Sequence, residues 1–206
     1  MKLNEKFGQL ASDETIQKTI AALKDNGIEA VAVQNSEAAK RKAFEIIPEG
    51  AEIMNMTSMT LESLSVVKEI LESGRFNSVR NKLNQMDRKT QGPEMQKIGA
   101  APEWVFGSVH AVTEDGQVLV ASNTGSQLPA YAYGAGHVIW IVGAQKLVKN
   151  LEEGLRRLYE YSLPLENERA KKAYGMSSNV SKILIVNKEL VKGRITMIIV
   201  KEKLGF

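Results

Sequence analysis

Apolar residues recur along the chain with two different spacings, which predict helices and strands in turn. In residues 12–25 the apolar positions Ile16, Ile20 and Leu23 lie three or four apart, the spacing of one helix face. Other segments are short apolar runs rich in β-branched residues, which favour strands. Strands are predicted at residues 28–33, 51–56, 109–112, 118–121, 138–142, 182–187 and 195–200.

The segments between these strands carry helical spacing. Helices are predicted from Ser36 to the residue before Pro48 and at residues 61–73, 77–86, 94–98, 147–158 and 166–172. Gln91-Gly92-Pro93 and Leu163-Pro164-Leu165 are expected to break the helical pattern. Helix and strand therefore alternate, which argues for an α/β fold with a parallel sheet covered by helices.

The centre of the chain, residues 107–146, carries the clearest chemical signal. Asp115-Gly116 between two predicted strands is a strong signal for a two-residue hairpin turn. The second of these strands runs into a small polar turn, whose backbone N–H groups and hydroxyls suit an anionic ligand. The same residue types are ordinary at strand ends and helix N-caps, so both interpretations stand. The candidate binding residues of this turn are Asn123, Thr124, Gly125, Ser126 and Gln127.

A second hydroxyl-rich loop follows the strand at residues 51–56. Thr57, Ser58 and Thr60 lie between that strand and the helix that begins near Leu61. The carboxyl end of a strand that leads into a helix is where open α/β sheets bind ligands. N-capping by Ser58 or Thr60 is the alternative, but capping needs only one hydroxyl.

Two further residues are candidates for the same site. Lys146 is expected at the start of the helix at residues 147–158, where its charge opposes the helix dipole and a nearby anion would stabilise it. His110, within a predicted strand, is included in the site, although a strand histidine is more often packed than functional. His137, at the start of another strand, is not included.

Composition restricts the class of protein. With 43% hydrophobic and 25% charged residues among 206, the chain is typical of a soluble globular protein. One domain is predicted over residues 1–206, with residues 1–27 as an N-terminal helical lead-in. No transmembrane run and no secretory signal are recognised, so no membrane association is predicted. The absence of cysteine excludes an iron–sulfur cluster or a thiolate metal site on this chain, and it fits a cytoplasmic protein.

Other common functions lack their sequence signals. The net charge of +3 is mild, and the basic stretch at residues 75–89 has no interleaved aromatic pattern, so nucleic-acid binding is not predicted. There is no Walker P-loop and no zinc-protease motif, and two histidines are too few to indicate a metal site. Gly134-Ala135-Gly136 precedes a strand rather than a helix, unlike a dinucleotide-binding loop. The cofactor, if one is used, stays unknown.

The sequence resembles the LUD-domain proteins, the lactate-utilization family. The residues that carry this resemblance are the segments at 107–148, 159–170 and 193–206. Proteins of that family are similar in fold to ribose-phosphate isomerases and CoA transferases. The resemblance therefore implies a single α/β domain with a mixed, mainly parallel sheet flanked by helices.

The resemblance also bears on chemistry. The family turn commonly reads Glu-Thr-Gly-Thr, and the matching residues here are Asn123-Thr124-Gly125-Ser126. In related CoA transferases this turn supplies a glutamate nucleophile, and the neutral carboxamide of Asn123 cannot form the acyl intermediate, which argues against CoA transfer. Relatives linked to L-lactate oxidation act alongside iron–sulfur proteins, which the resemblance implies as partners. A homodimer is compatible with the chain.

These signals together predict a protein of lactate or organic-acid utilization that binds a small anionic or phosphate-bearing metabolite. The site would lie between residues 57–60 and 123–127, with Lys146 as a counter-charge. One alternative is an enzyme of the isomerase or ATP-dependent cyclo-ligase type, which needs Asp115, Glu166 or Glu168 to point into the cleft as a general base. The other is a non-catalytic interaction subunit of an oxidoreductase complex, which needs an exposed apolar patch and a filled pocket.

Overall fold

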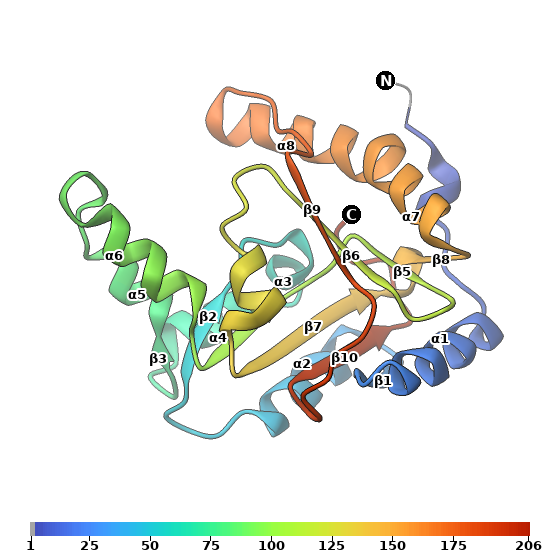
Figure 1. Cartoon of the computed structure of the whole chain (residues 1–206), viewed down its shortest axis with the longest axis horizontal. Coiled ribbons are helices and arrows are strands. Elements are labelled where there is room, and N and C mark those ends of the chain that lie inside the picture. The colour runs from blue at the N-terminus through green and yellow to red at the C-terminus, as the bar shows by residue number, and fades with distance from the viewer. Residues whose placement is uncertain (1–2) are drawn as a thin grey trace.

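A six-stranded sheet forms the centre of the computed structural model, which describes residues 3–206 (Figure 1). The strand order is β1-β10-β7-β4-β2-β3, and every neighbouring pair is parallel. The strands are β1 (Glu29–Val33), β2 (Glu52–Asn55), β3 (Asn77–Ser78), β4 (Trp104–Gly107), β7 (His137–Gly143) and β10 (Ile195–Val200). Parallel neighbours need crossover connections, which helices supply. The predicted α/β class with a mainly parallel sheet flanked by helices is confirmed.

A second sheet of four strands packs against the first. Its order is β8-β5-β6-β9, with β5 parallel to β8 and β6 antiparallel to both β5 and β9. Its strands are β5 (Ala111–Thr113), β6 (Val118–Ser122), β8 (Leu147–Val148) and β9 (Lys182–Val186). The predicted hairpin between β5 and β6 is present, with Gly116 at φ +79°. The two-residue turn length was wrong: the Thr113 N–H donates to the Gln117 carbonyl at 2.9 Å, so the loop consists of Glu114, Asp115 and Gly116, and Asp115 does not adopt a positive φ.

Helices cover both sheets. The α-helices are α1 (Asp13–Asp25), α2 (Ser36–Ile46), α3 (Met59–Ser63), α4 (Val66–Glu72), α5 (Val79–Asn84), α6 (Arg88–Ala100), α7 (Leu151–Arg157) and α8 (Leu163–Tyr174). Short 3-10 turns are η1 (Glu5–Gly8) and η3 (Ala144–Lys146), and π-helical turns are η2 (Ala130–Gly134) and η4 (Leu158–Ser162). Figure 1 shows α5 and α6 projecting as an arm, while α7 and α8 lie over the second sheet.

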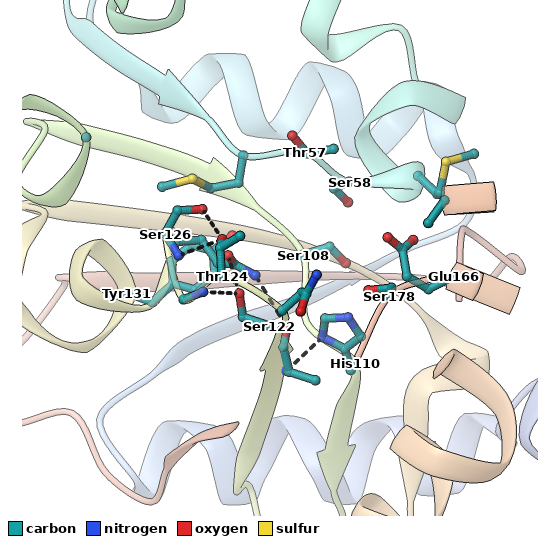
Figure 2. Close-up of a pocket in the computed structure, with 18 of the residues that line it drawn as sticks. Thr57, Ser58, Ser108, His110, Ser122, Thr124, Ser126, Tyr131, Glu166 and Ser178 are labelled. Atoms are coloured by element: carbon teal, nitrogen blue, oxygen red, sulfur yellow. Dashed lines mark hydrogen bonds between the residues drawn. The ribbon is translucent and has the colours of Figure 1, made fainter. Parts of the chain in front are cut away.

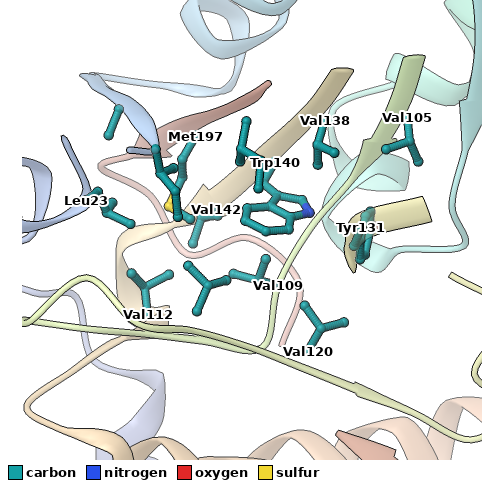
Figure 3. Packing of buried hydrophobic residues seen from close by; sticks show 14 of the residues in the cluster. Leu23, Val105, Val109, Val112, Val120, Tyr131, Val138, Trp140, Val142 and Met197 are labelled. Atoms are coloured by element: carbon teal, nitrogen blue, oxygen red, sulfur yellow. The ribbon is translucent and has the colours of Figure 1, made fainter. Parts of the chain in front are cut away.

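The hydrophobic core has two main layers, one on each face of the large sheet. Side chains alternate along β7, so that Trp140 and Val142 face one layer, whereas Ile139 and Ile141 face the other. The first layer lies between the two sheets, where Trp140 packs among residues from α1, β5 and β10 (Figure 3). Helices α2, α3 and α4 close the second layer. A third cluster joins the outer face of the small sheet to η4.

One central strand was missed by the sequence pattern. Trp104–Gly107 forms β4, which lies between β2 and β7 and has all four residues buried. The apolar run is short, and its terminal glycine lowers its strand signal. Because β4 joins two halves of the sheet, the residue that follows it, Ser108, lies beside the loop after β2.

Several predicted helix boundaries were wrong. Gln91-Gly92-Pro93 does not break the helix: α6 begins after the N-cap Asp87 and includes Pro93, which removes only one backbone hydrogen bond near the start of an exposed helix. Leu163-Pro164-Leu165 does not break the helical pattern either. The elements α7, η4 and α8 follow one another without a gap from Leu151 to Tyr174, and Pro164 lies in the first turn of α8, where proline is tolerated.

Lys146 does not begin a helix, contrary to the prediction. It ends the 3-10 turn η3, and Leu147 and Val148 then form strand β8 beside β5. Helix α7 begins at Leu151, after the N-cap Asn150, whose side chain accepts a hydrogen bond from the Glu153 N–H at 3.0 Å. Apolar spacing alone could not separate a short strand from the first turn of a helix.

Within residues 3–206, no helix combines the length and the apolarity that crossing a bilayer requires.

The close contact between β4 and η2 yields a stability prediction. A Cβ on Gly107 would lie 1.7 Å from the hydroxyl oxygen of Tyr131, so Gly107→Ala should lower the free energy of unfolding by about 1–3 kcal/mol through overpacking. Urea denaturation measures this. Gly92→Ala, within exposed α6 and with nothing within 4 Å, is the matched control and should be neutral or stabilising by up to about 1 kcal/mol. Equal effects of the two changes would contradict the packing of Tyr131 described here.

Candidate functional site

A cavity of about 1250 Å³ opens where the carboxyl ends of β2 and β4 meet the turn after β6. Figure 2 shows Thr57 and Ser58 on one side of it, across from Ser122 and His110. All the residues chosen from the sequence line this one cavity, although they come from distant parts of the chain. They are Thr57, Ser58, Thr60, His110, Asn123, Thr124, Gly125, Ser126, Gln127 and Lys146.

The three hydroxyls of the loop after β2 make different contacts. Ser58 caps α3, accepting a hydrogen bond from the Leu61 N–H at 3.5 Å. Thr60 is buried and donates its hydroxyl proton to the Leu204 carbonyl at 3.1 Å. Thr57 is exposed and lies on the cavity wall, so its hydroxyl is open to a ligand.

The turn after β6 is stabilised by hydrogen bonds from its own side chains. The Ser122 hydroxyl accepts a hydrogen bond from the Gly125 N–H at 2.8 Å and donates one to Oε1 of Gln127 at 2.9 Å. The Ser126 N–H donates to Oγ1 of Thr124 at 3.3 Å. Because hydroxyls of the turn already use these two amides, the turn offers side-chain groups rather than those N–H groups to the cavity.

Asn123 is oriented by a neighbouring segment. Its Oδ1 accepts a hydrogen bond from the Ser181 hydroxyl at 3.1 Å, just before β9. The carboxamide is exposed on the cavity wall, and its oxygen is engaged. The Nδ2 group is therefore the part of Asn123 that can donate a hydrogen bond to a ligand.

Lys146 is the central cation of the cavity wall. Its side chain is 2% exposed, and its Nζ lies 2.9 Å from Oγ1 of Thr60 and 3.1 Å from Oγ of Ser108. No carboxylate of the described chain pairs with it. Burial lowers the pKa of Lys146 well below the ordinary lysine value, and the positive charge of Arg157 lowers it further.

Arg157 is a second buried cation beside the cavity. Its Nη1 donates to the His110 carbonyl and, at 3.0 Å, to the Ser162 hydroxyl, while its guanidinium lies 5.0 Å from the centre of the Tyr161 ring. Its Nε and Nη2 are buried with no hydrogen-bond partner in the part of the chain described. Burial lowers the pKa of Arg157 to about 10, so the group stays charged at neutral pH.

His110 is held in one tautomer. Its Nδ1 accepts a hydrogen bond from the Ala121 N–H at 3.2 Å, so in the neutral ring the proton is on Nε2. Removal from water lowers the pKa of His110 to about 3, and the charges of Lys146 and Arg157 contribute. His110 is therefore neutral at physiological pH, and it presents an N–H donor to the cavity it lines.

The acidic residues proposed as general bases divide into two groups. Asp115 and Glu168 are exposed and do not line the cavity. Glu166 does line it, but both carboxylate oxygens accept hydrogen bonds from Arg169, at 2.7 and 2.8 Å. Arg169 also stacks on Tyr174 at 5.4 Å, so this ion pair forms part of the rim.

Six of the seven methionines among residues 3–206 line the same cavity. Methionine is flexible and adapts to irregular shapes, so these residues form an adaptable apolar wall beside the polar floor. The sequence pattern did not reveal this wall, because it comes from β2, α3, the α5–α6 arm and the segment after α8. The residues are Met54, Met56, Met59, Met86, Met95 and Met176.

Two candidate site residues were not predicted from the sequence. Ser108 would have been found if β4 had been recognised, because it is the first residue after that strand and so lies at the same sheet edge as Thr57. Arg157 carried no signal, since a charged residue on an amphipathic helix is normally exposed. His137 lies outside the cavity and stacks on Trp104 with ring centres 4.1 Å apart.

Metal binding has little support from the side chains. Residues 3–206 contain no group of three or more histidine, aspartate or glutamate side chains arranged to hold an ion.

Comparisons with known proteins identify a family and a similar fold. The model of the LUD domain matches residues 16–203. A crystal structure of a DUF162-family protein from Deinococcus radiodurans superposes with a TM-score of 0.55 and 12% identity, covering 93% of this chain and 99% of that one. The eIF2B delta structure from Chaetomium thermophilum gives a TM-score of 0.36 at 17% identity, over 69% of this chain and 54% of its own. No curated protein matches in sequence.

The neutral His110 predicts a pH dependence of stability. Since its folded pKa of about 3 is below the value of 6.5 in the unfolded chain, its contribution is present above pH 6.5 and is lost as pH falls towards 3. The free energy of unfolding should be lower at pH 5 than at pH 7.5 by about 2 kcal/mol from this group. Urea denaturation at the two pH values measures the difference. His110→Asn, which keeps an acceptor for Ala121, should reduce it; an unchanged difference would contradict the buried neutral ring.

Proposed function

The chain belongs to the LUD-domain family, and from this membership and the cavity we propose that it binds a small organic acid or a phosphate-bearing metabolite in lactate utilization. The supporting observation is the pair of buried cations, Lys146 and Arg157, neither of which pairs with a carboxylate among residues 3–206. Burying a charge is costly unless it is paired. An anion in the cavity would supply the missing counter-charge.

The neutral groups of the cavity complement such an anion. The Nε2–H of His110, the hydroxyl of Thr57 and the Nδ2 group of Asn123 are donors on its wall, and hydrogen bonds to a charged acceptor are about twice as strong as neutral ones. The anionic group would lie near Lys146. The adaptable methionine wall would contact the apolar part of the ligand.

The two alternative functions fare differently. A non-catalytic subunit would fill the pocket with its own side chains, and the open cavity of about 1250 Å³ counts against it. An isomerase or cyclo-ligase needs a general base, for which Glu166 is the candidate that lines the cavity, once it is released from Arg169. The likeness to the CoA-transferase fold, a homodimer, the cytoplasmic location and iron–sulfur partners stay predictions.

Ligand binding should be visible as thermal stabilisation. We expect L-lactate, pyruvate or a sugar phosphate to raise the Tm; a ligand at 100 times its Kd stabilises by about 2.7 kcal/mol, which is roughly 5–11 °C for a chain of this size. Lys146→Met should abolish the shift. Lys149→Met, which changes an exposed lysine nearby, is the matched control and should retain it. If no compound of this panel gave a shift, or if both variants kept it, the proposed site would be wrong.

Anion binding should be linked to proton uptake. Because the pKa of Lys146 is lowered in the free protein, and a neighbouring anion favours the ammonium form, binding of L-lactate should take up a proton. Affinity should therefore fall as pH rises through the lowered pKa. Titration calorimetry in buffers of different ionisation enthalpy measures the number of protons. An affinity and a binding enthalpy independent of pH and buffer would contradict a role for Lys146 as the counter-charge.

A further inference from the structure

The hydrogen bonds of Lys146 favour its neutral amine in the empty cavity. An ammonium group has three donors, and within residues 3–206 Lys146 has two partners, the hydroxyls of Thr60 and Ser108. Thr60 accepts, since its own proton is donated to the Leu204 carbonyl. The Ser108 hydroxyl is free to donate to the nitrogen lone pair of a neutral amine. The lowered pKa of Lys146 agrees with this arrangement.

The position of this amine suits reaction with a bound carbonyl. Nζ belongs to the wall of a cavity large enough for a ligand, yet the side chain is 2% exposed, so competing water is limited. A lysine next to another cation in a desolvated site is an activated nucleophile, and here Arg157 is that cation. An exposed lysine, by contrast, is mostly protonated at neutral pH.

We propose that Lys146 forms an imine with the keto carbon of a 2-oxo acid bound in the cavity. The idea deepens the proposed function, on which it rests, by naming the class of organic acid and a covalent step. Pyruvate is the simplest member of that class.

The step balances without any oxidant or reductant. The Nζ lone pair attacks the keto carbon, and a proton moves from nitrogen to the former carbonyl oxygen to give a carbinolamine. This intermediate takes up one proton from solvent at its hydroxyl group and loses one water molecule, so the C–O bond breaks and a protonated C=N bond forms. Ser108, which contacts Nζ at 3.1 Å, is the positioning residue that can carry the proton between nitrogen and oxygen.

The product would pair the buried positive charge at Nζ with a negative charge. A protonated imine of a 2-oxo acid is positive at nitrogen and has its own carboxylate on the adjacent carbon. The buried nitrogen thus acquires a counter-charge that the described chain does not provide. The Nε2–H of His110 and the Thr57 hydroxyl are the donors available to that carboxylate.

Reductive trapping tests the step directly. The full-length protein is incubated with pyruvate and sodium cyanoborohydride, which reduces an imine to a stable secondary amine. Peptide mass spectrometry should find Lys146 modified by the mass of pyruvic acid less one oxygen atom, with at least tenfold higher occupancy than exposed Lys149. L-lactate, which has no keto carbon, should give no adduct and, at saturation, should suppress trapping by pyruvate.

Variants separate the nucleophile from its surroundings. Lys146→Arg keeps a cation without a nucleophilic amine and should lose trapping; Lys149→Met should leave it unchanged. Ser108→Ala should slow trapping at Lys146 severalfold, with less effect on pyruvate-induced thermal stabilisation. The lactate competition uses the wild-type protein, so it tests whether the adduct forms in the cavity even if a variant fails to fold.

The outcomes distinguish the inference from the proposed function. Pyruvate stabilisation without an adduct on Lys146 would overturn the imine and leave organic-acid binding intact. Modification spread equally over exposed lysines, or insensitive to lactate, would also overturn the imine. Neither stabilisation nor an adduct with any acid of the panel would overturn both.

Discussion

Two buried basic side chains without a carboxylate partner among residues 3–206 are the feature on which the chemistry of the cavity depends. The charges of Lys146 and Arg157 both act on His110, and the groups that hydrogen-bond to these two side chains are hydroxyls and a backbone carbonyl. In such surroundings each charge is disfavoured, which is why the pKa of His110 falls and the lysine tends to lose its proton. The open cavity beside Lys146 allows an anion from solution to complete the pairing.

The fold maintains this arrangement through strand register. β2 and β4 are adjacent and parallel, with Asn55 opposite Phe106, so the loops that follow these strands begin at the same sheet edge. That register places the hydroxyl of Ser108 near the loop of Thr57 to Thr60. The small sheet adds the turn after β6, and α7 brings Arg157 under the backbone of His110. Each functional group therefore comes from a different element, and packing of Trp140 between the sheets holds these elements in place.

The chemistry open to this site differs from that of a CoA transferase. The sequence resemblance aligns Asn123 with the family's glutamate, and its Oδ1 accepts a hydrogen bond from Ser181. A neutral carboxamide is a poor nucleophile. The nucleophile that we propose instead is the amine of Lys146, which also lines the cavity. Binding of a simple carboxylate and imine formation with a 2-oxo acid use the same lysine in its two protonation states.

Sequence alone determined the α/β class and the set of candidate loops, because strand and helix spacing and hydroxyl-rich turns are local properties. All the chosen site residues line one cavity, since parallel strands end at a common edge. Local patterns could not reveal β4, and hence Ser108, because a four-residue run with a terminal glycine gives a weak signal. The burial of Lys146 and Arg157 was decided only by tertiary structure. Whether a lysine or arginine loses its contact with water depends on how sheets and helices pack, and nothing in the residues beside it records that.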